Sequence, residues 1–159
     1  MNKKITYLII PLLLFMASCS DDETFNLDDD DTISISSQSI TEEILELVNE
    51  HRQTIGMSSL SRNTVADSLA IVHTNYMISE RKISHDNFDE RFEQMQLKLN
   101  ARSAGENVAF GYPTAETVMT GWLNSTGHRA NIEGDFTHIG IAAIKNSQGT
   151  YYYTQLFYR

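Results

Sequence analysis

Ala104-Gly105-Glu106-Asn107 lies at the centre of four short polar segments, and the next of them reads Trp122-Leu123-Asn124-Ser125-Thr126-Gly127-His128-Arg129. Ser84-His85-Asp86 precedes these two segments, and His138-Ile139-Gly140-Ile141 follows them. Two histidines and the glutamate in these segments stand in Gly-flanked or turn-like stretches and not in apolar stripes. Proteins commonly place binding and catalytic groups on loops that a rigid scaffold holds. The pattern therefore indicates a polar site in the second half of the chain.

Apolar residues at helical spacing predict four helices around these segments. Ser39 and Glu42 form a capping box for the first helix, which should end before Gly56. Asn63 or Thr64 caps the second, which runs to about Arg81 with an inward face of Val65, Leu69, Val72 and Tyr76. Asn87 and Glu90 form a capping box for the third, which carries Phe88, Phe92, Met95 and Leu99. Thr114 caps the fourth, which buries Val118 and Trp122.

The predicted strands lie mostly near the end of the chain. Residues 139–145 and 151–158 are rich in β-branched and aromatic residues, and Gly149 stands in the hairpin loop between them. Residues 107–110 suit a short third strand. Helices on both sides of a small, mainly antiparallel sheet give an α+β fold, a three-layer α-β-α sandwich.

The N-terminus predicts export from the cytoplasm. Lys3 and Lys4 precede an apolar run from Ile5 to Phe15, and the only cysteine, Cys19, follows Met16-Ala17-Ser18. An apolar run of this length is typical of a secretory signal and is too short for a stable membrane span. Residues 16–19 resemble a bacterial lipobox, so residues 1–18 are interpreted as a lipoprotein signal peptide and Cys19 as the lipidated residue. The alternative is a chance cysteine beside an ordinary signal peptide.

An acidic segment follows Cys19. Residues 20–31 hold seven acids and no Lys or Arg, which predicts an extended tether over residues 19–38. Ser20-Asp21-Asp22-Glu23 resembles the surface-export signal of Bacteroidetes lipoproteins, which implies the outer face of the outer membrane. Residues 39–159 then form one domain.

The composition of the domain excludes several kinds of partner. The chain has a net charge of -9 and no basic stripe, which argues against nucleic acid as a partner. The single cysteine leaves no intrachain disulfide. No coiled-coil pattern or exposed apolar stripe is present, so a monomer is expected.

The segments, taken in order, resemble the CAP superfamily, also called SCP-like, in its bacterial extracellular form. Residues 47–52, 104–109 and 122–132 are similar to three phrases of that family, and residues 139–142 with 152–157 are similar to its closing hairpin. The resemblance runs from about Ile40 to Phe157. It implies an α-β-α sandwich with a central cavity, which two histidines and two acids line in many members.

Carried over residue by residue, the resemblance assigns the cavity to His85, Glu106, Ser125 and His128. Ser125 stands where the family has its second acid, which is a departure from the pattern. Two imidazoles and a carboxylate suit Zn²⁺ or a similar divalent ion, so His85, Glu106 and His128 are the expected metal ligands. Loss of the second acid should lower the affinity for such an ion.

Two functions follow as hypotheses. The first, which we favour, is a surface-anchored binding module for a small ligand, lipid, glycan or protein. The second is a metal-assisted or acid–base hydrolase, peptidase-like, acting on envelope or environmental polymers with His85, Glu106 and His128. Ser125 as a nucleophile is disfavoured because it lacks the G-x-S-x-G elbow. His51 and His73 lie on helices and are expected on polar faces.

Overall fold

The computed structural model describes residues 30–159, with side chains from Ile40 onward. Its elements are α1 (Asp30–Thr54), β1 (Ser61–Arg62), α2 (Thr64–Glu80), α3 (Phe88–Leu99), β2 (Ala104–Phe110), α4 (Ala115–Leu123), α5 (Thr126–Ile132), β3 (His138–Lys145) and β4 (Tyr151–Tyr158). The predicted signal peptide, Cys19 and the predicted tether up to residue 29 lie outside the described residues. None of the helices described is both long and apolar enough to cross a membrane.

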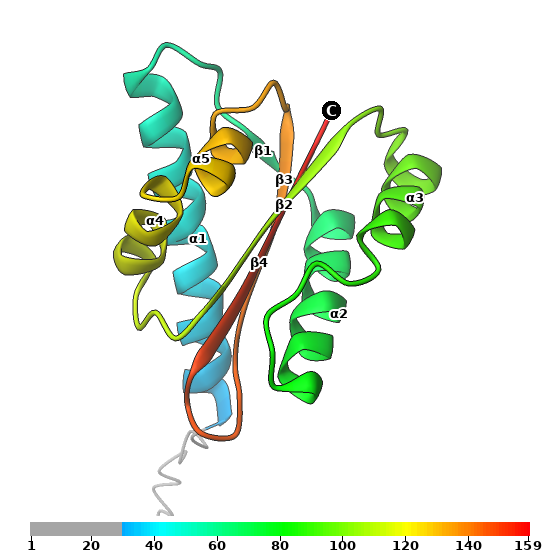
Figure 1. Ribbon diagram of the computed structural model, residues 1–159. Helices are drawn as coiled ribbons and strands as arrows, with labels where there is room; N and C mark the ends of the chain where they lie inside the picture. The colour runs from blue at the N-terminus through cyan, green and yellow to red at the C-terminus, as the bar shows by residue number, and fades with distance from the viewer. Residues whose placement is uncertain (1–29) are drawn as a thin grey trace, which may run out of the picture.

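The four strands form one sheet in the order β1-β3-β4-β2. β4 pairs antiparallel with β3 on one side and with β2 on the other, and β1 adds a short parallel pairing to the start of β3. α1, α4 and α5 lie on one face of this sheet, and α2 and α3 lie on the other (Figure 1). The predicted α+β three-layer sandwich with a mainly antiparallel sheet is therefore confirmed.

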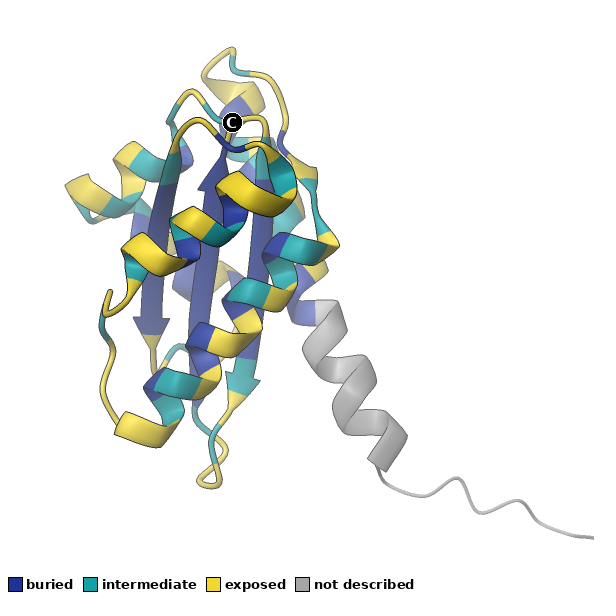
Figure 2. Cartoon of the chain, turned by 90° about the vertical axis from the view of Figure 1, so that its right-hand side faces the viewer, coloured by how far each residue is buried: buried dark blue, intermediate teal, exposed yellow. Residues whose placement is uncertain are grey.

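The sheet is the buried layer between the helices, whose outer surfaces are exposed (Figure 2). Every residue of β4 is buried. One apolar cluster fills the space under α1, α4 and α5 and includes Trp122, Tyr153 and Phe157. A second, smaller cluster lies under α2 and α3 and includes Met95 and Leu156. The sheet thus supplies side chains to the apolar clusters on both of its faces.

The first helix begins earlier than the capping box predicts. α1 runs from Asp30 to Thr54, so Ser39 lies within the helix and does not cap it. No Pro or Gly stands between residues 30 and 39 to stop the helix from extending backward. Residues 30–38, expected in the tether, therefore belong to α1 in this structure. The predicted end before Gly56 is confirmed.

The second helix has the predicted ends but a different inward face. Asn63 caps α2 through hydrogen bonds from the N–H groups of Val65 and Ala66. The buried side is one residue out of phase with the prediction, with Val72 exposed, and comprises Ala66, Ala70, His73, Thr74 and Met77. The cause is close backbone contact with β3. A Cβ atom on Gly140 would lie 2.3 Å from the carbonyl carbon of Ala66, so only small residues fit this contact.

The third helix is present, but its predicted capping box is wrong. Asn87 precedes α3 in the left-handed conformation (φ 57°), and its side chain makes no capping hydrogen bond. Asparagine tolerates this conformation better than most residues, which explains its place in the turn. α3 buries Arg91 together with Met95.

The fourth helix begins as predicted, with Thr114 and Thr117 forming the cap of α4 and Trp122 buried. α5 was not predicted, because seven residues with only Ile132 buried carry no apolar periodicity. His128 therefore lies on a helix and not in a turn.

The closing hairpin is confirmed as β3 and β4. β2 starts at Ala104, three residues before the predicted strand, and pairs with β4 over its whole length. Glu106 is consequently a strand residue with a buried side chain. β1 is too short to leave a pattern in the sequence.

Candidate functional site

The predicted cavity residues come from three separate parts of the fold. His85 lies in the loop between α2 and α3, Glu106 lies in β2, and His128 lies in the first half of α5 with Ser125 just before it. α5 lies on the α1 side of the sheet, whereas the His85 loop belongs to the α2 and α3 side. The site thus depends on the correct assembly of all three layers.

Glu106 is the centre of the site. Its side chain is 2% exposed, and its Oε1 accepts hydrogen bonds from His85 Nδ1 at 2.8 Å and from Arg91 Nη2 at 2.8 Å. Its Oε2 accepts from Arg91 Nε at 2.7 Å. The carboxylate is therefore held by a two-point guanidinium pair and an imidazole, the arrangement that a buried charge requires.

Arg91 is the functional residue that the sequence analysis missed. Its side chain is 9% exposed, and besides Glu106 it donates to the carbonyl oxygen of Asp86 at 2.7 Å. It thereby ties the His85 loop, α3 and β2 together. A signal was present, since Arg91 is three residues after Phe88 and four before Met95 on the inward face of the helix. A charged residue in such a stripe needs a buried partner.

His73 is a second missed neighbour. It was expected on a polar face, which is wrong, since it is 2% exposed. Its Nε2 donates to the carbonyl oxygen of Ser84 at 2.8 Å and lies 3.8 Å from Glu106 Oε1. Burial lowers the pKa of His73, and the nearby Glu106 carboxylate offsets this only in part. His73 is thus a neutral buried group that supports the loop carrying His85.

His85 presents one ring nitrogen to solvent. Its side chain is 54% exposed, while Nδ1 faces the Glu106 carboxylate. A carboxylate partner fixes Nδ1 as the donor, which leaves Nε2 as the acceptor of the neutral ring. The imidazole is therefore both oriented and accessible.

His128 lies near His85 but does not reach Glu106. Burial lowers the pKa of His128, and the charge of His85 lowers it further. In residues 40–159, no hydrogen bond or ion pair joins the His128 ring to Glu106 or to Ser125. Ser125 occupies the position before α5 without making a side-chain cap.

An amide network positions α5 against β2. Asn131 Nδ2 donates to the Glu106 carbonyl oxygen at 3.0 Å and to Asn107 Oδ1 at 2.9 Å. Asn107 Nδ2 donates to the His128 carbonyl oxygen and to Gln155 Oε1, both at 3.1 Å. The network fixes where the His128 backbone lies relative to Glu106.

The residues do not fit a metal ion well in this arrangement. Within the described chain, no group of three His, Cys, Asp or Glu side chains is placed to hold a metal. Both Glu106 oxygens already face the guanidinium of Arg91, which carries the positive charge that a metal would bring. A dication beside that guanidinium would meet like-charge repulsion. His85, Glu106 and His128 are therefore not assembled here as three metal ligands.

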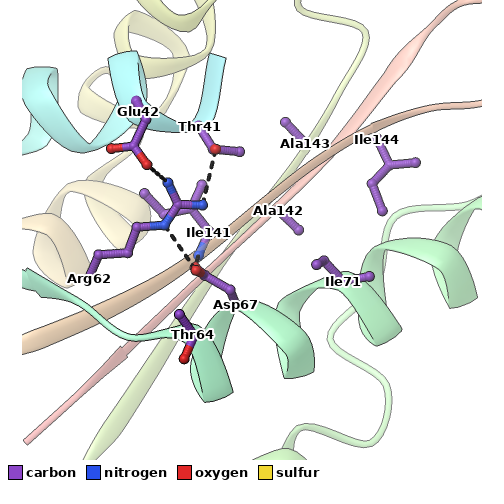
Figure 3. Close-up of a pocket in the computed structure, with 10 residues that line it drawn as sticks. All are labelled: Thr41, Glu42, Arg62, Thr64, Asp67, Ile71, Ile141, Ala142, Ala143 and Ile144. Atoms are coloured by element: carbon purple, nitrogen blue, oxygen red, sulfur yellow. Dashed lines mark hydrogen bonds and ion pairs between the residues drawn. The ribbon is translucent and has the colours of Figure 1, made fainter. Parts of the chain in front are cut away.

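A different hollow, of about 530 Å³, lies between α1, α2 and β3. Arg62 crosses one end of it, forming an ion pair with Glu42 and hydrogen bonds to Asp67 and Thr41 (Figure 3). Asp67 in turn accepts from the N–H of Ile141 at 2.8 Å, on the edge of β3 that β1 leaves open. These interactions cover the open edge of the sheet. We therefore assign a structural role to the Arg62 cluster, and not a binding or catalytic one.

Comparison with known proteins agrees with this architecture. The family model described as CAP, the cysteine-rich secretory protein family, matches residues 45–157. The uncharacterized protein YkwD of Bacillus subtilis is 32% identical over 107 residues, 65% of this chain and 42% of that protein. The uncharacterized membrane protein YlbC of the same organism is 31% identical over 121 residues, 72% of this chain and 33% of that protein. The chain spans less than half the length of either relative.

Solved structures show the same fold. An extracellular protein with an SCP domain from Bacillus anthracis has a TM-score of 0.72 at 26% identity, covering 82% of this chain and 43% of that one. An outer surface protein from Borrelia burgdorferi has a TM-score of 0.66 at 19% identity, covering 84% of this chain and 96% of that one. At this identity the likeness supports the fold alone. With a family match over most of the domain, the chain belongs to the CAP family, the cysteine-rich secretory protein family.

Proposed function

We propose that this CAP domain is an extracellular binding module, anchored to the outer membrane through lipidated Cys19, whose cavity binds a polar ligand through His85 and His128. The observation that carries the proposal is the engagement of Glu106. Arg91 and His85 use both of its oxygens, so the carboxylate orients the site and is not offered to a ligand. The accessible polar atom is Nε2 of His85.

The proposed ligand contact needs no metal. Arg91 balances the charge of Glu106 from within the chain, and the two imidazoles then supply hydrogen-bonding nitrogens to the ligand. A calorimetric titration with Zn²⁺ at neutral pH tests this, with His85→Ala and His128→Ala as comparison variants. We expect no one-site heat. One-site binding that both substitutions abolish would contradict the proposal and restore the predicted metal site.

A binding test can use three soluble probes: a disaccharide–tetrapeptide from peptidoglycan, a lyso-phosphatidylglycerol below its micelle concentration, and inorganic phosphate. Two-dimensional NMR of the histidine rings reports directly on the site. We expect at least one probe to move both the His85 and His128 resonances, and His85→Gln to abolish the response. If none of the three probes shifts the resonances of either ring, the cavity is not the binding surface.

One observation favours the alternative of a hydrolase. A histidine whose Nδ1 faces a buried carboxylate and whose Nε2 faces solvent has the arrangement of a general base. The base would then be His85, accepting a proton from an attacking water, because both oxygens of Glu106 are already engaged. Mass spectrometry of the first two probes after incubation separates the hypotheses. Cleavage that is lost in His85→Gln but kept in Ser125→Ala would favour the hydrolase.

A further inference from the structure

A second polar hollow, of about 330 Å³, lies beside the loop of the β3–β4 hairpin. Seven residues line it: Ile78, Arg81, Phe110, Asn146, Ser147, Gln148 and Tyr152. None of them belongs to the cavity of His85 and Glu106. The hollow combines an exposed aromatic ring with several hydrogen-bond donors, and this combination is what identifies its ligand.

The aromatic wall is Phe110, the last residue of β2. It is 46% exposed although phenylalanine is normally buried, and its ring packs on buried Tyr152 with 4.6 Å between centroids. The contact packs the Phe110 ring against Tyr152 while nearly half of the residue stays exposed. A fixed aromatic face suits the apolar C–H face of a sugar ring.

Asn146 supplies a fixed donor. Its Oδ1 accepts from the backbone N–H groups of Gln148 and Thr150, both at 3.0 Å, so the loop itself holds the amide. Its Nδ2 makes no hydrogen bond within residues 40–159. The two N–H groups of Nδ2 are therefore oriented and available to an acceptor.

Arg81 supplies the charge. Within the described part of the chain Arg52, Arg81, Arg102 and Arg129 form no ion pair, and of these Arg81 is the one that lines the hollow. An unpaired guanidinium in a domain with excess acid is placed to bind an anion, and it matches a carboxylate in two-point geometry.

We infer that this hollow binds a sugar that carries a carboxylate, a uronic acid, alone or as a residue of a polymer. Phe110 stacks on the sugar ring, Arg81 pairs with the carboxylate, and Asn146 and Gln148 donate to oxygens. The inference is independent of the cavity and of its ligand.

Two substitutions isolate the donors without disturbing the fold. Asn146→Asp keeps the oxygen that the loop needs and replaces only the free NH₂ with a negative oxygen. Arg81→Asn removes the guanidinium at a left-handed position (φ 54°) that asparagine tolerates well. Asn100→Asp is the matched control, because it adds the same charge at the exposed end of α3, away from the hairpin (Figure 1).

The test is an amide NMR titration of the purified protein with trigalacturonic acid and, separately, with neutral maltotriose. We expect the acidic sugar to move the Asn146 and Gln148 signals, and Asn146→Asp and Arg81→Asn each to weaken binding by about tenfold or more, the usual cost of a charged hydrogen bond. Phe110→Ala should weaken it by a similar factor, and Asn100→Asp by less than about twofold.

Three results would overturn the inference: no response to trigalacturonic acid, equal binding of maltotriose, or unchanged affinity in Asn146→Asp. His85→Gln should leave the binding of trigalacturonic acid at the hairpin unaltered. Failure of the uronic acid inference can therefore be distinguished from failure of the cavity proposal.

Discussion

Arg91 contributes more to the structure of the site than any residue that the sequence analysis identified, because it pairs with the buried carboxylate of Glu106. It is the internal cation for a buried carboxylate, and removing one partner of such a pair leaves the other charged and unpaired. Arg91→Met should therefore lower the free energy of unfolding by about 3–5 kcal/mol. Urea denaturation followed by circular dichroism measures the change.

The control for Arg91→Met is Arg159→Met, which removes an exposed ion pair with Asp135 and should cost about 1 kcal/mol or less. The double variant Arg91→Met with Glu106→Leu should recover much of the lost stability, because no unpaired charge remains. Equal losses in the two single variants would show that the Arg91–Glu106 pair contributes no more than a surface contact.

His73 predicts a loss of stability in mild acid. Its folded-state pKa lies below the ordinary value because burial disfavours the charged ring, although Glu106 partly opposes this and Arg91 and His85 add to it. The unfolded chain therefore binds the proton more readily. The free energy of unfolding should fall as the pH drops below about 6.5, until the folded-state pKa is passed.

Denaturation of the wild type and of His73→Gln at about pH 7.5 and 5.5 measures this dependence. Glutamine retains an N–H donor for the Ser84 carbonyl oxygen without taking up a proton. We expect a smaller difference between the two pH values in the variant. His128→Gln should remove a further part of the pH dependence of stability, since burial also lowers the pKa of His128. A pH dependence that neither variant changes would assign it to other groups.

At the scale of elements, the contact between α2 and β3 sets the geometry under the site. Gly140→Ala would place a Cβ atom 2.5 Å from the Ala66 carbonyl oxygen, so one element must move. Such overpacking should cost about 1–3 kcal/mol and displace His73. Thermal unfolding measures the cost, and the His73 ring signals in NMR report the displacement.

Gly127 provides the comparison for Gly140. It lies on α5, and a Cβ atom added there would meet nothing within 4 Å, so Gly127→Ala should leave stability unchanged or raise it by up to about 1 kcal/mol. If Gly140→Ala were tolerated equally well, the close contact would not determine the phase of α2.

Elements with a strong local signal could be predicted from the sequence, and those that depend on tertiary contacts could not. The cap at Asn63, the cap at Thr114 and the closing hairpin were all recognised because each rests on side chains close in sequence. The predicted phase of α2 was wrong because Gly140, more than sixty residues later, selects Ala66 over a larger apolar side chain.

The candidate site likewise contains residues that could be predicted from the sequence and residues that could not. His85 and Glu106 were recognised through short phrases of sequence, and the structure brings them to 2.8 Å. Arg91 and His73 were missed because each looks like an ordinary helix residue until the layers are assembled. The metal set was inferred from the family resemblance and the residue types, and neither can show that a guanidinium is paired with the carboxylate.

At the scale of the whole molecule, the proposed lipid anchor depends on Cys19. Cys19→Ala should prevent lipid attachment and move the protein from the membrane fraction to the soluble fraction. Fractionation with metabolic palmitate labelling measures this, and Ser20→Ala is the control. Protease treatment of intact cells then tests surface display. Retention of labelled Cys19→Ala in the membrane fraction would contradict the lipoprotein prediction.

The order of the strands has a consequence for biosynthesis. β4 is made after β2 and β3, yet it lies between them and supplies pairing to both. Until residues 151–158 leave the ribosome, β2 has no neighbouring strand, and the apolar clusters on the two faces of the sheet lack the side chains that β4 supplies, such as Phe157 and Leu156. Partly made chains are therefore open and unable to fold ahead of completion, a state that a secretion channel for unfolded polypeptides can accept.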